Sequence, residues 1–506
     1  MNIGKTVALI VSLLTTCSTL QAANWPAWRG PTGQGFCEEK NLPLKWSDKE
    51  NVKWKVKLAH QGNSTPVVWG DRIFLTQANK GGGQRSLLCF ARADGKLLWQ
   101  KDVAYPEKER NWTPDWYANA SPVTDGERVV VSFASAGMYC FDFDGKEIWK
   151  RTDLGKWEHQ FGSGSSPVLY RDLAILWCGP NEGKGRNFLL AVNKKTGKTV
   201  WEHDESYGSW STPLIAKIGN QDHLLLGQSR DVKSLPESKT GFLRGFDPMT
   251  GKELWRCQGL NSYNYTSPLC GNGVAVAMSG YGGSALAVKL GGSGDITKDR
   301  LWLHPSNNQR VGSGMIVGDH VYLVDEPGVP RCYELKTGKE TWKVKKRPGD
   351  MTWGSMVHAD GRLYVLMRNG ATLVFAADPR YQLLAVNSLG ADENTNSSLA
   401  ISKGDIFIRT FKHLWCIGAG GLQTGSADGK ATNLCKSALT PQSLSRLVND
   451  CGPGKPQKTT QPWRSVPTRA LHEDSPGGAR GALSQGAFTP AQRQRHRLEM
   501  DHWPKS

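Results

Sequence analysis

The residues of this chain that could do chemistry lie in short segments that lead into apolar strands. They combine aromatic rings with imidazole, amide and guanidinium groups, and they are His60, Asn63, Trp116, Tyr117, His159, Gln160, Tyr207, Trp210, Tyr263, Tyr265, Arg310 and Trp353. Rings offer stacking surfaces and polar groups offer directed hydrogen bonds, which together suit a planar or extended polar ligand. In the alternative interpretation these residues plug a central channel and pack neighbouring units, and this is the favoured one for His60 and His159 individually.

No local pattern marks out a catalytic or metal-binding residue. The acidic residues expected near the same segments are Asp115, Glu158, Glu205, Asp231, Glu326, Asp350 and Glu393, and none of them falls in a known signature. The 11 cysteines include neither a Cys-x-x-Cys motif nor an adjacent pair, so neither a zinc site nor covalently attached haem is predicted. The catalytic residues therefore stay unassigned, and no metal ligands are assigned.

A repeated turn sets the spacing of these segments. The motif Asp/Thr-Gly-Lys-x-x-Trp occurs at 94–99, 144–149, 196–201, 250–255 and 337–342. The tryptophans at positions 54, 99, 149, 201, 255, 302 and 342 are 40 to 54 residues apart, which is the size of a four-stranded propeller blade rather than of a helical repeat. The chain is thus predicted to be an all-β repeat protein.

The first strand of each repeat is marked by serine or threonine, in most repeats followed by proline. Proline cannot donate to a sheet ladder, so its fixed place indicates the entrance of a strand. Eight first strands are expected, near Thr65, Ser121, Ser166, Thr212, Ser267, Ser313, Ser355 and Ser398. The last unit lacks a fourth strand, whereas 52–56 is a fourth strand without three before it. We therefore predict an eight-bladed β-propeller closed by its N-terminal strand, with seven blades as the alternative.

The cysteines are explained mainly by packing. Aligning the third strands places small residues in one slot: Cys89, Cys140, Ala191, Gly245, Ala287, Cys332, Ala376 and Cys416. Such cysteines act as compact buried apolar side chains. Two disulfide pairings remain open in an oxidising compartment, Cys257 with Cys270 and Cys435 with Cys451.

Outside the repeats, the two ends of the chain differ in composition. Residues 1–23 have the lysine, apolar run and small-residue end of a signal peptide, which predicts export to the periplasm or the medium, with a lipid anchor at Cys17 as the alternative. Residues 24–50 are expected to be an N-terminal extension and 51–418 the propeller. Residues 419–506 are predicted to be a disordered tail. This tail carries 12 Lys and Arg against 6 Asp and Glu, so it accounts for part of the net charge of +17. We expect no nucleic-acid partner, no transmembrane segment and a monomer.

The repeat motif resembles that of a known family. The Gly-Lys-x-x-Trp turns, the Ser/Thr-Pro-Val strand entrances and the opening segment 24–31, Asn-Trp-Pro-Ala-Trp-Arg-Gly-Pro, resemble pyrroloquinoline-quinone-type propellers of secreted proteins over about 24–418. This family includes quinone-dependent alcohol and sugar dehydrogenases and also the non-catalytic propeller lipoprotein of the outer-membrane β-barrel assembly machinery. For the dehydrogenases, the resemblance implies pyrroloquinoline quinone and calcium. This chain departs from them, because it lacks their adjacent cysteine pair and any attached haem domain.

Two functional hypotheses follow. The favoured one is a binding or scaffolding module that holds a protein or a glycan-like ligand on its aromatic-rich axial face, with no cofactor assigned. The alternative is a pyrroloquinoline-quinone-dependent alcohol or sugar dehydrogenase. That enzyme would need calcium held by carboxylate and amide oxygens and an aspartate that accepts the substrate hydroxyl proton.

Overall fold

The computed structural model describes residues 24–109, 117–181, 185–205, 208–229, 241–261, 263–309 and 311–420. These residues belong to one compact unit, which comprises residues 1–424. The predicted signal peptide, and the predicted tail from residue 421 onward, lie outside the described residues. Among the described residues, no helix is long and apolar enough to cross a membrane.

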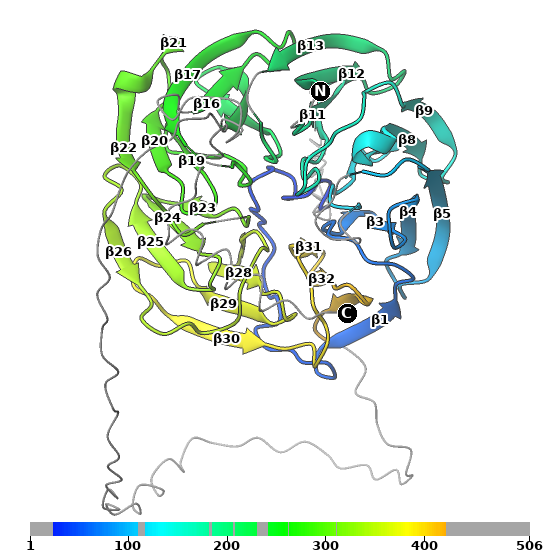
Figure 1. Cartoon of the computed structure of the whole chain (residues 1–506). Helices are drawn as coiled ribbons and strands as arrows, with labels where there is room; N and C mark the ends of the chain where they lie inside the picture. The colour runs from blue at the N-terminus through cyan, green and yellow to red at the C-terminus, as the bar shows by residue number, and fades with distance from the viewer. Residues whose placement is uncertain are drawn as a thin grey trace, which may run out of the picture. The chain divides into compact units, whose positions relative to one another are not determined.

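Eight sheets, each built on four antiparallel strands, stand around a central axis, as Figure 1 shows, so the predicted eight-bladed propeller is confirmed and the seven-bladed alternative is wrong. Blades 1 to 4 contain β2 (Val67–Trp69), β3 (Arg72–Ala78), β4 (Gln84–Ala91) and β5 (Leu97–Ala104); β6 (Val123–Thr124), β7 (Arg128–Ser132), β8 (Met138–Asp142) and β9 (Glu147–Arg151); β10 (Val168–Tyr170), β11 (Leu173–Cys178), β12 (Asn187–Asn193) and β13 (Thr199–Glu205); and β14 (Leu214–Ile218), β15 (Gln221–Gln228), β16 (Gly241–Phe246) and β17 (Glu253–Leu260).

Blades 5 to 8 contain β18 (Leu269–Gly271), β19 (Val274–Met278), β20 (Ala285–Lys289) and β22 (Arg300–His304); β23 (Met315–Val317), β24 (His320–Val324), β25 (Pro330–Glu334) and β26 (Glu340–Lys343); β27 (Val357–Ala359), β28 (Arg362–Leu366), β29 (Thr372–Ala376) and β30 (Leu383–Asn387); and β31 (Ala400–Ser402), β32 (Asp405–Arg409), β33 (His413–Ile417) and β1 (Val52–Lys57). A short strand, β21 (Gly294–Asp295), is added to blade 4, and two 3-10 helices are present, η1 (Ala134–Ala136) and η2 (Thr297–Asp299).

The N-terminal strand closes the ring, as predicted. β1 pairs antiparallel with β33, with Trp54 opposite Cys416, so the first and last described strands of the ring share one sheet. This arrangement covers the sheet edge that blade 8 would otherwise expose.

A tryptophan seam joins consecutive blades and explains the repeated turn. In blade 1, Trp99 faces Cys89 across the sheet, and its indole N–H donates to the carbonyl of Phe143 in blade 2 at 2.9 Å. Trp54, Trp149, Trp201 and Trp302 each donate in the same way to the next blade. The turn glycine of that next blade lies on the ring: at Gly145, with φ +80°, a Cβ would come 2.9 Å from Trp99. Only glycine combines this conformation with this closeness.

The small-residue slot opposite the tryptophan is confirmed in seven blades and was misassigned in one. In blade 7 the slot belongs to Val374, which faces Ala385, and not to Ala376. This blade has no tryptophan on its fourth strand, so its slot does not need a small side chain. The predicted alignment of blade 7 is therefore off by two residues. Because side chains alternate along a strand, Ala376 and Val374 still point to the same face of the sheet.

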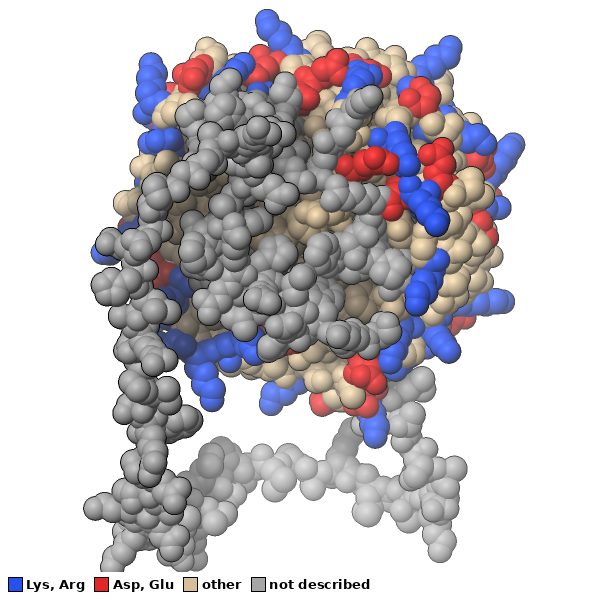
Figure 2. Space-filling view, in the orientation of Figure 1, with Lys and Arg blue, Asp and Glu red and all other residues tan. Residues whose placement is uncertain are grey.

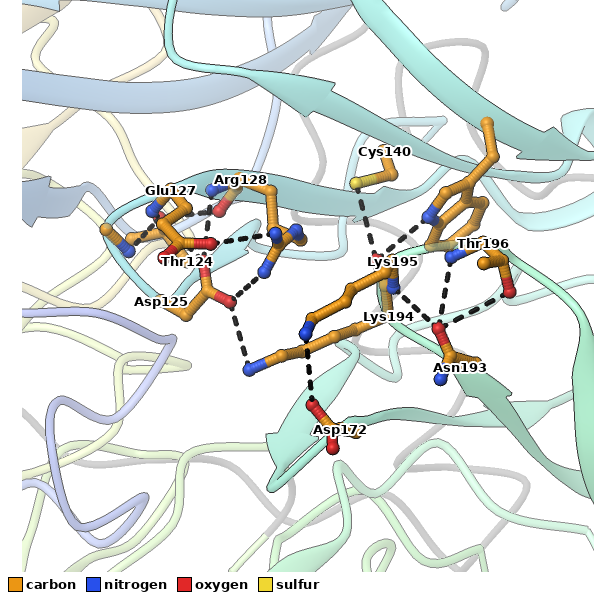
Figure 3. Close-up of polar contacts among 12 residues, drawn as sticks. Thr124, Asp125, Glu127, Arg128, Cys140, Asp172, Asn193, Lys194, Lys195 and Thr196 are labelled. Carbon is orange, nitrogen blue, oxygen red and sulfur yellow. Dashed lines mark hydrogen bonds and ion pairs between the residues drawn. The ribbon is translucent and has the colours of Figure 1, made fainter.

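Charged side chains reinforce the same seam between blades 2 and 3 (Figure 3). Lys194 of blade 3 accepts the indole N–H of Trp149 at its carbonyl, and its ammonium lies 3.1 Å from Asp125 of blade 2. Arg128 contacts the same carboxylate at 2.6 Å. Burial would raise the pKa of Asp125, but the backbone N–H groups of Arg128 and Glu127 and the Lys194 ammonium hold that pKa below its ordinary value.

The serines and threonines at the strand entrances form a hydrogen-bonded circle around the axis, here called the hydroxyl ring. In six pairs of neighbouring blades the backbone N–H of one member donates to the hydroxyl of the next at 2.8–3.0 Å, as from Thr65 to Ser121. The circle closes from Ser398 to Thr65 at 3.3 Å. Between blades 4 and 5 the Ser267 hydroxyl donates instead to the Thr212 carbonyl at 2.7 Å. The repeated hydroxyl residue is therefore a structural requirement of the channel wall.

The described cysteines are all free thiols, so the proposed pairing of Cys257 with Cys270 is wrong. Cys257 lies on the fourth strand of blade 4, whereas Cys270 lies on the innermost strand of blade 5. Burial raises the pKa of both thiols to about 11, which keeps them protonated at neutral pH. Cys435 and Cys451 lie outside the described residues.

Residues 24–37, here called the strap, cross the central channel (Figure 1, blue). Trp25 forms an isolated β-bridge with Val68 of blade 1, and Phe36 forms one with His358 of blade 7. Between them, the buried Arg29 donates to the carbonyl of Gly314 in blade 6 at 2.7 Å. Burial lowers the pKa of this guanidinium to about 9. The opening segment noted in the sequence is thus a brace across the ring.

Candidate binding site on the axial face

One position in every blade lies two residues before the hydroxyl ring and lines the mouth of the channel. We call this side, onto which the loops into the first strands open, the axial face. The eight residues at this position are Asn63, Asn119, Gly164, Trp210, Tyr265, Val311, Trp353 and Asn396. Four of the predicted site residues, Asn63, Trp210, Tyr265 and Trp353, therefore occupy equivalent places around one axis.

Asparagines of three neighbouring blades are linked in a chain on this face. Asn396 donates to the amide oxygen of Asn63 at 3.3 Å, and Asn63 donates to that of Asn119 at 2.6 Å. Asn119 then donates to the backbone carbonyl of Ser163 at 2.9 Å. This amide chain runs over blades 8, 1 and 2 as far as blade 3.

The amide chain continues into a clamped tryptophan on blade 7. Arg368 donates from Nε to the amide oxygen of Asn396 at 3.2 Å, and its guanidinium lies 4.6 Å from the centre of the Trp353 ring. The indole N–H of Trp353 donates to Glu326 at 2.8 Å. A cation over the ring and a carboxylate at its N–H together fix the orientation of Trp353.

The opposite part of the axial face is a cluster of aromatic rings from blades 3, 4 and 5. Its members are His159, Phe161, Trp210, Tyr263, Tyr265 and Tyr281. His159 and Trp210, at 2% and 7% exposure, form the floor, with ring centres 4.5 Å apart and planes at 86°. The other four rings are half-buried. Tyr263 joins the two levels, since it lies 5.3 Å from Trp210 and 5.5 Å from Tyr281.

Hydrogen bonds hold the floor of this aromatic cluster in place. The indole N–H of Trp210 donates to the carbonyl of Gly162 at 2.8 Å. His159 accepts the backbone N–H of Phe161 at Nδ1, at 3.1 Å. Because both floor rings are tied to blade 3 loops, the half-buried rings above them rest on a defined surface.

Buried polar atoms beside the aromatic cluster have no hydrogen-bond partner among the described residues. They are both side-chain amide atoms of Gln228, the Ser279 hydroxyl and the Asn264 amide oxygen. Gln228 ends the second strand of blade 4, and Ser279 follows the second strand of blade 5. Buried polar groups are nearly always paired, so these atoms offer hydrogen bonds to water or to a ligand. Sequence reasoning missed them; the polar residue at the end of a second strand is the signal that could have found them.

The remaining predicted residues are not members of this cluster or lie outside the described residues. Tyr117 stacks under the guanidinium of Arg85 at 5.2 Å and lines a small cavity of about 20 Å³. His60 and Gln160 are half-buried. Trp116, Tyr207 and Arg310 lie outside the described residues.

The described acidic candidates do not gather into a calcium site. Glu205 contacts Arg244 at 2.6 Å, Glu158 contacts Lys156 at 2.9 Å, and Glu326 accepts the indole of Trp353. Asp115 and Asp231 lie outside the described residues. Among the residues that are described, no three His, Cys, Asp or Glu side chains are placed to hold a metal ion.

Glu393 is also committed to protein partners. Its carboxylate contacts Lys55 at 3.2 Å and accepts the Thr410 hydroxyl at 2.6 Å. Burial would raise the pKa of Glu393, but the Thr410 and Lys55 hydrogen bonds and the charge of His413 hold it below its ordinary value. Among the described side chains no calcium site is thus assembled, whereas the half-buried rings offer a stacking surface to a planar ligand.

Comparison with known proteins places this geometry in a family. A family profile described as outer membrane protein assembly factor BamB, of the PQQ_2 repeat type, matches residues 84–344. The chain belongs to this family. Its curated relatives carry names of two kinds, alcohol dehydrogenase and outer membrane protein assembly factor.

Curated relatives of both kinds are similar to the chain over part of their length. The quinohemoprotein alcohol dehydrogenase ADH-IIG of Pseudomonas putida is 23% identical over 361 residues, which are 65% of this chain and 39% of that enzyme. The outer membrane protein assembly factor BamB of Burkholderia pseudomallei is 22% identical over 287 residues, 56% of this chain and 65% of that protein. The chain thus spans less than two thirds of either relative.

Solved structures of both kinds share the fold. BamB from Moraxella catarrhalis superposes with a TM-score of 0.51 at 13% identity, covering 74% of this chain and 98% of that one. The quinohemoprotein alcohol dehydrogenase of Comamonas testosteroni superposes with a TM-score of 0.59 at 12% identity, covering 81% and 82%. At these identities the likeness shows the propeller fold alone.

Figure 2 shows how charge is spread over the visible surface. Lys and Arg side chains alternate with Asp and Glu around the rim of the ring. The formal positive charge of the chain is therefore not gathered into one patch on the part of this face that is described.

Proposed function

We propose that this protein is an exported, monomeric binding or scaffolding module whose axial face holds a protein or a glycan-like ligand. The observation that carries the proposal is the aromatic cluster: four half-buried rings rest on the buried floor of His159 and Trp210. A binding hot spot typically consists of well-packed aromatic anchors, surrounded by contacts that contribute little binding energy but exclude water.

The polar part of the axial face supports the same function. The amide chain presents side chains whose orientation is already fixed by one another, and Gln228 and Ser279 add buried groups that lack a described partner. A ligand that meets prearranged groups loses less entropy on binding than one that must order them.

The test replaces one ring and compares it with a matched tyrosine elsewhere. Tyr265→Ala removes a half-buried ring of the aromatic cluster, whereas Tyr381→Ala removes a half-buried ring that packs on Trp342, 5.0 Å away, at the outer rim. Protein ligands are captured with a photo-reactive residue at position 263 in cells, and glycans are measured by calorimetry against a panel of soluble oligosaccharides. We expect binding in one of the two assays, weakened by at least about 2 kcal/mol in Tyr265→Ala and unchanged in Tyr381→Ala. Absence of binding in both assays, or unfolding of Tyr265→Ala, would reject the proposal.

A quinone-dependent alcohol dehydrogenase is the second candidate, because two curated relatives carry that name. Against it, Glu158, Glu205, Glu326 and Glu393 are each bonded to other side chains, and no calcium site is gathered among the described residues. The protein is mixed with calcium and pyrroloquinoline quinone, and its absorption spectrum and its reduction of an artificial electron acceptor are recorded with alcohols and sugars. Turnover that a single channel-lining Asp→Asn variant abolishes would replace the binding proposal with this one.

A further inference from the structure

In the innermost strand of every blade, one residue directs its backbone N–H and C=O toward the channel rather than toward the neighbouring strand. This position lies three residues after the hydroxyl ring, and its occupants are Val68, Thr124, Leu169, Ile215, Cys270, Ile316, His358 and Ile401. In blades 1, 3, 5 and 7 each of these residues faces the second residue of the neighbouring second strand. In blade 4, Ile215 faces Leu224, the fourth residue of β15, and a shift of two residues keeps the same alternation of backbone groups. Their channel-facing N–H and C=O groups are therefore oriented alike.

The strap satisfies this position in four blades. Val68 exchanges two backbone hydrogen bonds with Trp25, both of 2.8 Å, and Thr124 donates to the carbonyl of Pro26 at 2.9 Å. The N–H of Cys270 donates to the side chain of Gln34 at 2.8 Å. His358 is bonded on both sides, by Gly35 and by Cys37. The strap thus lies along the inner edges of blades 1, 2, 5 and 7.

The inner edges of blades 3 and 4 are left open. Among the described residues, no strap or loop group hydrogen-bonds the channel-facing backbone of Leu169 or Ile215. Both residues are half-buried, whereas Ile316 and Ile401, the other positions that the strap does not pair, are buried at 6% and 0% exposure. The gap therefore falls on two adjacent blades.

A cavity of about 990 Å³ fills the space between these open edges and the strap. One wall is formed by strap residues 30–34, and the other by Val168, Leu169 and 213–219 of blades 3 and 4, flanked by parts of blades 2 and 5. This volume lies at the upper end of the roughly 300–1,000 Å³ that is typical of ligand pockets. It lies on the side of the strand turns, opposite the axial face.

The wall chemistry selects the kind of occupant. The side chains are mostly apolar, and the acids at the rim are already bonded: Asp125 by Arg128 and Lys194 (Figure 3), and Asp222 by the hydroxyl of Tyr170. What remains unpaired are backbone donors and acceptors on apolar walls. An open strand edge of this kind is satisfied by another extended backbone.

We propose that an extended, apolar peptide segment of a partner protein binds in this cavity and pairs with the inner edges of blades 3 and 4 at Leu169 and Ile215. The peptide continues the lining that the strap begins on blades 1 and 2. Main-chain hydrogen bonds supply the pairing and the apolar walls select the side chains. This site is separate from the proposed function on the axial face and does not depend on it.

Proline at Ile215 provides a selective perturbation. The N–H of this residue faces the channel rather than the sheet ladder, so Ile215→Pro removes the donor for the peptide and leaves the pairing of β14 with β15 intact. Ile215→Val keeps the donor and is the matched control. Leu169→Glu, which keeps the backbone and charges the apolar wall, is the second variant in case the proline disturbs folding.

The probe is a displayed library of linear, cysteine-free peptides selected on the full chain. We expect selected peptides to lose roughly 10-fold or more in affinity for Ile215→Pro, to bind Ile215→Val and Tyr265→Ala as they bind the original protein, and to protect the amides of Leu169 and Ile215 from hydrogen exchange. Thermal melting checks that each variant is folded.

Three results would overturn the proposal. In the first, no peptide is selected. In the second, Tyr265→Ala weakens the binding of the selected peptides, whereas Ile215→Pro and Leu169→Glu leave it unchanged. In the third, fatty acids or other small apolar molecules protect the two amides and peptides do not. The second of these would place the peptide on the axial face and leave the proposed function standing.

Discussion

The seam between blades 8 and 1 gives a prediction whose magnitude follows from the coordinates. Gly95 has φ +72°, and a Cβ on it would lie 2.7 Å from both the Trp54 ring and Val56 of β1. Gly361, in a turn of blade 7, has nearly the same φ, +69°, with nothing within 4 Å. Alanine costs the same backbone strain at both positions, but only Gly95→Ala also forces β1 outward.

The two substitutions should differ in the free energy of unfolding by the cost of the steric overlap with β1. Left-handed backbone costs about 1–2 kcal/mol for a residue with a Cβ, and overpacking adds about 1–3 kcal/mol. We therefore expect Gly361→Ala to lower the free energy of unfolding by about 1–2 kcal/mol and Gly95→Ala by roughly 2–5 kcal/mol. Urea unfolding followed by tryptophan fluorescence measures both.

A second substitution tests whether the contact with β1 is the cause. Val56→Ala removes the methyl group that the new Cβ meets, so it should recover part of the loss in the Gly95→Ala background, as a positive coupling in a double-mutant cycle. Equal costs for Gly95→Ala and Gly361→Ala, or strictly additive costs with Val56→Ala, would refute the account of the seam.

The remaining predictions concern the strand, the tail and pH. Deleting residues 51–58 removes the fourth strand of blade 8 and should sharply lower the urea midpoint; an unchanged midpoint would contradict closure by β1. Removing residues 421–506 should leave the melting temperature unchanged, because their composition lacks the apolar content to offset the entropy of ordering; a shift of many degrees would show that they dock. Burial lowers the pKa of His358, so the folded state binds its proton less readily than the unfolded chain and stability should fall as the pH drops below about 6.5. His358→Gln should reduce that slope, and an identical pH profile would exclude His358 as its source.

The blade count and the closure could be predicted because each depends on a pattern local in sequence. Tryptophan spacing defines the unit, and the isolated strand around Trp54 could only complete a blade that lacked one. The slot in blade 7 could not be predicted in the same way. Where no tryptophan demands a small partner, Val374 fits as well as Ala376, and only the bulged ladder decides between them.

The candidate site could be predicted in its residue types but not in its grouping. Trp210, Tyr263 and Tyr265 were all found, yet the sequence does not show that Phe161 and Tyr281 complete their cluster, because the contacts cross three blades. Asn396 and Arg368 were missed for the same reason. Counting two residues back from each strand-entrance serine or threonine would have located Asn396.

The cavity on the other side of the ring was not predicted, because the sequence there shows only tight turns. It results from the path of the strap, which follows the inner edges of blades 1 and 2 and then rejoins the ring at blade 5. No residue of blades 3 or 4 encodes that path, so the open edges become visible only when the strap is in place.

Closure by β1 also sets an order of events during synthesis. The strand that holds the ring shut is made first, but its partner β33 follows about 360 residues later, which at ~5–20 residues per second takes roughly 20–70 s. Throughout that interval the N-terminal strand has no partner, and each finished blade awaits the next one. When the chain is released progressively, it is therefore most prone to aggregate just before the last strand emerges. A factor that shields the unpaired strand β1, rather than the whole propeller, would be enough to protect the chain at that stage.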